Sequence, residues 1–478
     1  MLFNSFAFAV FFVVVYSLYL ATMRRLRVQN LILLAASYFF YGWWDWRFLG
    51  LLFASTIFDF TFARVIDATQ SAARRHCILV ASVVMNLGFL GFFKYFNFFS
   101  SNAALFMRSL GFEASAFTLE VTLPLGISFY VFQSMSYVID VYRRDLKPCR
   151  SFFDFALFVS FFPQLVAGPI ERATNLLPQI TRPRRLAPDQ VHAGIFLIFA
   201  GLYKKLVIAD NLAPIADAAF GSLSGSSPAS PPGLNLIVGA MAFTFQIYGD
   251  FSGYSDMARG LAKVMGFDLM LNFRLPYFAL SPSDFWRRWH ISLSTWLRDY
   301  LYVPLGGNRG SRLFTARNML LTMLLGGLWH GAAWNFVLWG TYHGALLVLY
   351  RLLAPNLGIQ NPWRSRRAAA CSLAQMAFMF LLTVIGWVLF RSKSFDQILC
   401  FFSHLRLNRD ESTSSMVRTL LYCAGPLVAF QVVQYSTGNL LVVLRWPLAV
   451  RVLALAFLIS AALAFGVDAA NDFIYFQF

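Results

Sequence analysis

The chain has 478 residues, of which 58% are hydrophobic, 18% are aromatic and only 13% are charged. About a quarter of the residues in an ordinary soluble domain are charged, and this chain has more apolar surface than a globule of its size can bury. These values exclude a soluble enzyme, a disordered chain and a disulfide scaffold. We therefore expect an all-α polytopic membrane protein, because helices satisfy their own backbone groups inside a bilayer.

The net charge is +17, from 39 Lys and Arg against 22 Asp and Glu. In a soluble protein this balance would suggest a nucleic-acid partner. Basic residues collect in the cytoplasmic loops of membrane proteins, so we expect membrane lipids and no nucleic acid as partners. The five cysteines are scattered and form no CxxC pair, which predicts neither a disulfide framework nor a metal site.

Long apolar segments recur along the whole chain. They cover residues 1–22, 29–44, 48–66, 77–98, 120–142, 152–170, 190–212, 234–249, 314–350, 370–391, 414–436 and 452–467. Arg24, Arg25 and Arg27 follow the first segment rather than precede it, which indicates a membrane span and not a cleaved signal peptide. The basic loops then alternate so that both termini lie outside, and the pattern predicts roughly 11 spans.

Three stretches do not fit a simple series of spans. Residues 150–190 begin and end with arginines, which predicts a segment that enters the membrane and returns. Residues 261–313 are too polar to span but contain Phe, Trp and Leu throughout, so we expect a cytoplasmic-side block that either lies on the membrane or folds partly into it. The Gly-Ser-Pro run 221–233 predicts a flexible outside loop. We see no internal repeat, so the inverted-repeat plan of many transporters finds no support.

His330 stands out among the polar residues within apolar segments. It lies in MLLTMLLGGLWHGAAWNF (319–336) with glycines on both sides, which weaken the helix and let a substrate approach the backbone. The run 314–350 is too long for one span and predicts a helix broken near His330. Imidazole transfers protons near neutral pH, so His330 is a candidate base. The alternative is a neutral histidine that hydrogen-bonds a carbonyl freed by the break.

A second candidate is His290, in SDFWRRWHISLSTW. It follows Asp284, Arg287 and Arg288 among three tryptophans, and the pattern alone favours an interfacial aromatic and basic belt. His343 lies on an apolar helix, where we expect a core histidine with satisfied hydrogen bonds.

Polar residues also gather at the end of the segment 234–249, in QIYGDFSGYSD. For Asp250 and Asp256 in this run we expect helix caps by default; the alternatives are that they pair with the arginines or line a polar cavity. Lys204 and Lys205 lie deep in an apolar segment; they either snorkel to the interface or contact a substrate phosphate.

Several catalytic motifs are absent. The chain has no GxSxG, Walker A, HExxH or DxD sequence. If the protein is an enzyme, we expect a histidine to act without a metal.

The motifs that are present resemble those of the membrane-bound O-acyltransferase family. The matching stretches are FFPQLVAGPIER (161–172), QIYGDFSGYSDMARG (246–260), the stretch 271–309 with RWHISLS, GGLWHGAAWNFVLWGTYHG (326–344) and FIYFQF (473–478). The resemblance covers residues 1–478 as a single integral membrane domain, and its signature core lies at about 120–350. It is similar to the branch that O-acetylates bacterial polysaccharides such as alginate, and more distantly to the proteins of teichoic acid D-alanylation.

The resemblance implies a fold and a set of site residues. The family fold is a ring of helices with re-entrant segments around a central tunnel. His330 corresponds to the catalytic histidine and His290 to the second signature position. We expect the donor to be acetyl-CoA, bound from the cytoplasm by Arg287 and Arg288 and contacted by further residues, Trp329 and Asn335.

The resemblance also implies partners and a location. We expect a bacterial inner membrane protein with both termini in the periplasm, which passes acetyl groups to a periplasmic SGNH-type partner protein or directly to a polysaccharide. Alternatives are peptidoglycan, cellulose or another cell-envelope acceptor, or a non-catalytic transporter.

Overall fold

The computed structural model describes residues 1–120, 122–166, 168–223, 232–353, 366–466 and 473–474. This part of the chain is helical and contains no strand. It divides into two compact units, which we call unit 1 (Met1–Ile198 and Met257–Met270) and unit 2 (Phe199–Asp256 and Leu271–Phe478). Most of the predicted loop 221–233 lies outside the described residues.

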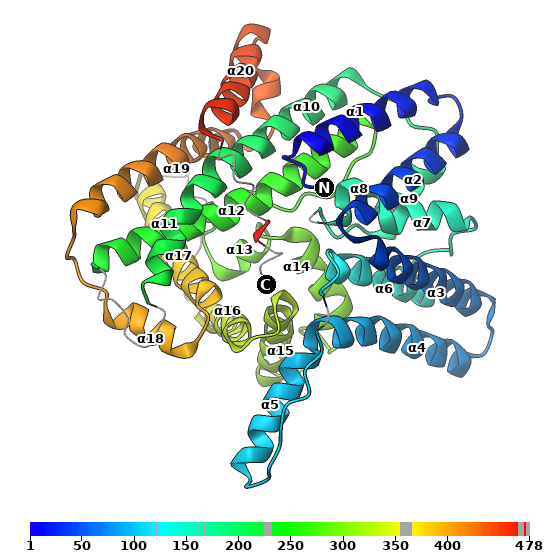
Figure 1. Ribbon diagram of the computed structural model, residues 1–478, viewed down its shortest axis with the longest axis horizontal. Coiled ribbons are helices and arrows are strands. Elements are labelled where there is room, and N and C mark those ends of the chain that lie inside the picture. The colour runs from blue at the N-terminus through cyan, green and yellow to red at the C-terminus, as the bar shows by residue number, and fades with distance from the viewer. Residues whose placement is uncertain (121, 167, 224–231, 354–365, 467–472, 475–478) are drawn as a thin grey trace. The chain divides into compact units, whose positions relative to one another are not determined.

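Unit 1 consists of the N-terminal helices. They are α1 (Phe6–Ala21), α2 (Leu26–Asp45), α3 (Leu49–Ala68), α4 (Ala72–Leu90), α5 (Phe96–Ser109), α6 (Ile127–Arg143), α7 (Phe152–Ser160), α8 (Phe162–Leu165), α9 (Ala173–Thr181) and most of α10 (Pro188–Tyr203), with the short turns η1 (Trp46–Phe48) and η2 (Gly91–Tyr95). Helix α3 packs against α4 and α6 (Figure 1). Between α3 and α4, the buried Asp59 carboxylate accepts hydrogen bonds from Ser82 Oγ and Asn86 Nδ2. Both hydrogen bonds go to Oδ1 of Asp59, so this oxygen of the buried carboxyl group is paired, as burial requires.

The stretch 150–190 forms three short helices, α7, α8 and α9. None has more than nine residues, whereas a helix needs about 20 residues to cross a bilayer. Ser151 caps α7 by accepting a hydrogen bond from the Asp154 amide, and Pro163 lies in the first turn of α8. The expectation that this stretch is not a simple span agrees with the structure, and its re-entry into the membrane stays a prediction.

Unit 2 contains the remaining helices. They are α11 (Asp210–Gly221), α12 (Gly233–Val264), α13 (Pro282–Trp286), α14 (Ile291–Leu297), α15 (Arg312–His330), α16 (Trp334–Leu353), α17 (Arg366–Arg391), α18 (Phe395–Ser403), α19 (Glu411–Thr437) and α20 (Leu448–Phe465), with the short turns η3 (Lys204–Ala209), η4 (Pro276–Phe278), η5 (Arg298–Tyr302) and η7 (Val442–Arg445). The last turns of α12 belong to unit 1. All predicted site residues lie in unit 2.

Helices α15 and α16 form a tightly packed hairpin (Figure 1). Helix α15 ends at His330 and α16 begins at Trp334, so the predicted helix break near His330 is confirmed. A Cβ atom added to Gly327 would lie 2.2 Å from the Phe336 carbonyl oxygen, and one added to Gly340 would lie 2.3 Å from the Met323 carbonyl oxygen. Gly327 therefore allows α16 to pack closely against α15. It does not leave the space for a substrate that we expected.

The polar block 261–313 is buried on one side and exposed on the other. Its short helices α13 and α14 bury Phe285, Trp289 and His290, while Arg298 and Arg309 are exposed. One side of the block therefore packs into the protein, and its expected position on or in the membrane stays a prediction.

Among the described residues, seven helical segments are long and apolar enough to cross a membrane. They are Leu26–Ala68, Ala72–Ser109, Pro188–Gly221, Trp334–Leu353, Ala369–Arg391, Glu411–Thr437 and Leu448–Phe465. The first three of these each contain two successive helices. The predicted class of all-α polytopic membrane protein is confirmed, and the number of about 11 spans stays a prediction.

Candidate active site

His330 is the last residue of α15, at the turn into α16. Its residue surface is 4% exposed. The imidazole centroid lies 5.0 Å from the Trp339 ring on α16 and 5.4 Å from the Phe390 ring on α17, with both pairs close to perpendicular. Aromatic rings from two neighbouring helices therefore surround the His330 imidazole.

His290 is fully buried and adopts an unusual backbone conformation. It precedes α14 with φ 43° and ψ 54°, in the left-handed region. A residue other than glycine pays about 1–3 kcal/mol there, and such strain persists where the surroundings fix it. Asn272 provides that restraint: its carbonyl oxygen accepts from the Ile291 amide at 2.9 Å, and its Oδ1 accepts from Ser292 Oγ at 2.7 Å. Asn272 Nδ2 in turn donates to Ser255 Oγ on α12 at 2.8 Å.

The structure brings His290 and His330 to the same tryptophan. The Trp329 ring centroid lies 5.9 Å from that of His290 and 5.1 Å from that of His330, in edge-to-face arrangements. Two histidines that are distant in the sequence thus share one buried aromatic neighbour. This juxtaposition is the central feature of the candidate site.

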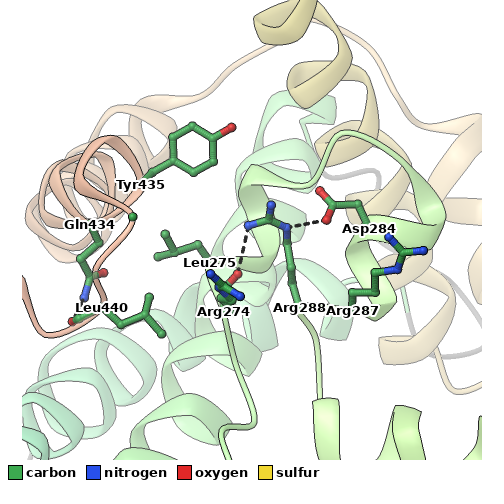
Figure 2. Close-up of a pocket in the computed structure, with 9 residues that line it drawn as sticks. Arg274, Leu275, Asp284, Arg287, Arg288, Gln434, Tyr435 and Leu440 are labelled. Atoms are coloured by element: carbon green, nitrogen blue, oxygen red, sulfur yellow. Dashed lines mark hydrogen bonds and ion pairs between the residues drawn. The ribbon is translucent and has the colours of Figure 1, made fainter. Parts of the chain in front are cut away.

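A pocket of about 380 Å³ opens on the side of α13 (Figure 2). It is lined by Arg274, Leu275, Asp284, Arg287, Arg288, Gln434, Tyr435, Gly438 and Leu440. Three guanidinium groups face one carboxylate, so the lining has an excess of positive charge and suits an anionic ligand. The two predicted donor-binding arginines, Arg287 and Arg288, therefore line one pocket.

Arg288 is fixed within this pocket, as Figure 2 shows. Its Nε donates to Asp284 Oδ1 at 2.8 Å and a terminal nitrogen donates to the Arg274 carbonyl at 3.3 Å. Asp284 Oδ2 also accepts from the Leu280 amide at 3.1 Å. Arg287 is exposed, and Figure 2 shows its side chain beside Asp284.

Aromatic rings connect the pocket-lining helix α13 with His330. Trp286, at the end of α13, contacts Trp339 with ring centroids 5.7 Å apart, and Trp339 contacts His330 at 5.0 Å. The expected tunnel to both faces of the membrane stays a prediction.

His343 lies beside Trp286 and Trp339, the two tryptophans just described. It is 1% exposed and contacts Trp339 at 4.8 Å and Trp286 at 5.2 Å between ring centroids. The expected core burial is confirmed. The expected satisfaction of its hydrogen bonds is wrong for Nδ1, which has no hydrogen-bond partner among the described residues. An added Cβ on Gly386 would lie 2.8 Å from His343 Nε2, so α17 packs directly against the ring.

The two adjacent lysines form internal ion pairs. Lys205 Nζ lies 2.8 Å from Asp210 Oδ1 and 3.0 Å from Asp250 Oδ1, and all three side chains are almost completely buried. Lys204 Nζ lies 2.6 Å from Asp256 Oδ2. The expectation of snorkelling lysines is therefore wrong for Lys205. The default expectation of helix caps is wrong for both aspartates, which lie inside α12 and pair with the lysines.

Asn335 makes a structural contact in the first turn of α16. Its Nδ2 donates to the Phe390 carbonyl at 3.0 Å, which ties α16 to α17 beside His330. Contacts of Asn335 and Trp329 with a donor stay predictions.

Asn272, Trp339 and Phe251 complete the site but were not identified from the sequence. The Phe251 ring lies 4.6 Å from the His290 imidazole, measured between ring centroids. Asn272 is the single polar residue in the run Leu271–Phe273, which was the available signal for it. The two aromatic residues carry no such signal in a chain with 53 Phe and 12 Trp.

Glu171 belongs to the GPIER stretch in unit 1, outside the seven candidate spans. It is fully buried, and its carboxylate accepts hydrogen bonds from Asn175 Nδ2 at 2.7 Å and from the Met270 amide. Burial raises the pKa of Glu171 to about 7, against a smaller lowering by these hydrogen bonds and by Arg259 and Arg172.

The described residues contain no group of three His, Cys, Asp or Glu side chains that would hold a metal ion. The five cysteines are free thiols.

The fold and site define a membrane-embedded helical protein with a pair of buried histidines and a basic pocket. Residues 78–392 match the model of MBOAT, the membrane-bound O-acyltransferase family. The chain is 41% identical to the probable alginate O-acetylase AlgI of Azotobacter vinelandii, over 95% of each chain. The chain therefore belongs to the membrane-bound O-acyltransferase family, as its motifs indicated.

Two further relatives have different named acceptors. The chain is 38% identical to a peptidoglycan O-acetyltransferase of Helicobacter pylori, over 77% of this chain and 72% of the relative. It is 25% identical to a teichoic acid D-alanyltransferase of Bacillus subtilis, over 57% of this chain and 69% of the relative. Relatives with the same family membership thus differ in the polymer that their names give.

Proposed function

We propose that this chain transfers acetyl groups from cytoplasmic acetyl-CoA across the bacterial inner membrane for O-acetylation of an exported polysaccharide such as alginate. The observation that carries the proposal is the juxtaposition of buried His290 and His330 around Trp329. The full-length similarity to an alginate O-acetylase supports the choice of acetyl group and acceptor class.

In the proposed reaction, His330 acts as the general base. The acceptor hydroxyl gives its proton to the neutral imidazole while its oxygen bonds to the thioester carbonyl carbon. Collapse of the tetrahedral intermediate breaks the carbon–sulfur bond, and the CoA thiolate takes the proton back from the imidazolium. General-base catalysis of this kind contributes about 10²–10⁴-fold in rate. The proposed reaction involves neither a metal ion nor an oxidation or reduction.

His290 orients the thioester or stabilises the negative charge that develops on its oxygen. Stabilising that charge requires a donor held in place before the reaction. The restraint of the His290 backbone by Asn272 supports this role, because the strained conformation is fixed by buried hydrogen bonds.

The donor binds with its phosphates in the pocket of Arg287 and Arg288, and its pantetheine arm extends toward His330. The excess positive charge of the pocket supports this assignment. The contacts from Trp286 through Trp339 to His330 support this direction for the arm. In this arrangement Trp329 and Asn335 lie along the reacting end of the donor.

The acceptor is a serine of a periplasmic SGNH-type partner protein or the polysaccharide itself, and both chain termini lie in the periplasm. A second candidate acceptor is peptidoglycan, which the Helicobacter pylori relative supports. Deletion of the gene, followed by acetyl analysis of the exported polysaccharide and of peptidoglycan, distinguishes the two, because only the true acceptor loses acetyl groups.

The test of the reaction uses purified protein in lipid nanodiscs with radiolabelled acetyl-CoA. We expect thiol release and acetyl transfer by the wild type, loss of both in His330→Ala, and a reduced rate in His290→Ala. His192→Ala is the matched control, because His192 is exposed and lies in unit 1. Full activity in a folded His330→Ala protein overturns the mechanism. A wild type that releases no thiol supports the transporter alternative instead.

A further inference from the structure

Phe473 and Ile474, near the C-terminus, are buried and belong to unit 2. Their residue surfaces are 0% and 2% exposed. The Ile474 amide donates a hydrogen bond to Asp250 Oδ2 on α12 at 2.6 Å. These two residues are therefore fixed in the protein interior by a charged acceptor.

The acceptor Asp250 is itself held by a buried charge network. Lys205 lies 3.0 Å from Asp250 Oδ1 and 2.8 Å from Asp210 Oδ1. Buried ions are stable only when their charges and hydrogen bonds are satisfied together. The Ile474 amide supplies one of the hydrogen bonds of this network, so the network and the C-terminal residues stabilise one another.

Phe473 is also connected with His290, through the ring of Phe251. Phe473 lies 4.6 Å from Tyr254 and 5.9 Å from Phe251, measured between ring centroids. Phe251 lies 4.6 Å from the His290 imidazole at an interplanar angle of 89°. Phe251 thus stands between Phe473 and the imidazole.

The backbone and the ring of His290 are restrained from different sides. Asn272 fixes the strained backbone through hydrogen bonds to Ser292, while Phe251 contacts the ring from α12. Because aromatic packing of this kind is directional, displacement of Phe251 changes the orientation of the imidazole.

We propose that Phe473 and Ile474 form a positioning element that holds the His290 imidazole in place for acyl transfer, through Phe251 and the Lys205–Asp250 ion pair. The inference rests on the proposed function for the role of His290. It assigns a role to the Lys205–Asp250 pair and to Phe473 and Ile474. None of these four residues has a role in the chemical steps proposed above.

The first test removes the amide donor of Ile474. Ile474→Pro eliminates the N–H group that Asp250 accepts, whereas Ile474→Val keeps it. We expect kcat to fall about 10-fold in Ile474→Pro, because small displacements of positioned groups reduce rates steeply, while the KM for acetyl-CoA and the amount of folded protein stay close to wild type. Phe473→Ala should behave in the same way and Phe473→Leu should recover part of the loss. Phe465→Ala is the control, because Phe465 is exposed at the end of α20.

The second test distinguishes positioning of His290 from a general structural role. In a His290→Ala background, Ile474→Pro should lower kcat no further. Diethylpyrocarbonate, which modifies accessible neutral imidazoles, should label His290 severalfold faster in Ile474→Pro than in wild type or Ile474→Val, as followed by mass spectrometry. Labelling measures packing without any reaction, so it remains informative if the proposed function fails. Unchanged kcat and unchanged labelling in Ile474→Pro overturn the inference, as does an equal loss of kcat in both backgrounds.

Discussion

The packing of α15 against α16 allows a quantitative prediction about Gly340. A Cβ atom at this position would lie 2.3 Å from the Met323 carbonyl oxygen, where ordinary contacts begin at 3.4 Å. Gly340→Ala therefore requires the two helices to separate by about 1 Å. Overpacking of this kind costs about 1–3 kcal/mol of stability. Gly340 directly follows Trp339, whose ring contacts His330, so the same movement separates the His330 imidazole from its aromatic neighbour.

We expect Gly340→Ala to lower kcat about 100-fold, because a displacement of 1 Å in an active site has effects of that size. The KM for acetyl-CoA should change little, since none of the residues that line the basic pocket belongs to α15 or α16. The assay is labelled acetyl transfer by folded, monodisperse protein, together with its thermal unfolding midpoint.

Gly425→Ala is the matched control for Gly340→Ala. Gly425 lies inside α19, and a Cβ added there meets nothing within 4 Å. This variant should keep wild-type kcat and gain up to about 1 kcal/mol of stability, the difference in helix propensity between alanine and glycine. A Gly340→Ala protein with wild-type kcat would refute the argument that helix contact positions His330.

Three further predictions concern charged residues. Arg287→Ala should raise the KM for acetyl-CoA about 10-fold with little change in kcat, because a hydrogen bond to a charged group contributes about 1.5–3 kcal/mol. The control is a substitution of Arg418, which is exposed. An unchanged KM in Arg287→Ala contradicts the pocket assignment. Lys205→Met leaves two buried carboxylates without their cation and should destabilise the protein by about 3–5 kcal/mol in thermal or denaturant unfolding; a loss below 1 kcal/mol would show that the network is not internal. Burial raises the pKa of Glu171 from 4.5 to about 7, so the unfolded chain releases this proton first and stability falls by about 3 kcal/mol between pH 4.5 and pH 7. Glu171→Gln should remove that part of the pH dependence of the unfolding midpoint, and an unaltered pH profile would exclude a buried carboxyl at this position.

The sequence by itself determined the class of protein, and it predicted the principal site residues. Composition and segment length depend on each residue's own affinity for lipid, so the all-α membrane class follows without any knowledge of packing. The helix break at His330 was predictable because it depends on local features, namely the glycines beside His330 and the length of the apolar run 314–350. The pairing of the RWHISLS and WHG stretches also identified His290 and His330, through the family resemblance.

Only the tertiary structure decided how these residues are supported. Lys205 pairs with Asp250, Asn272 restrains His290, and Phe473 reaches Phe251, each across a separation that no local pattern encodes. Gly327 looked like a site of substrate approach, but the second helix of the hairpin occupies that space. The physical reason is that helical periodicity and hydrophobicity are properties of neighbouring residues in one segment. The partner of a buried polar or aromatic group is instead chosen by which helices pack together.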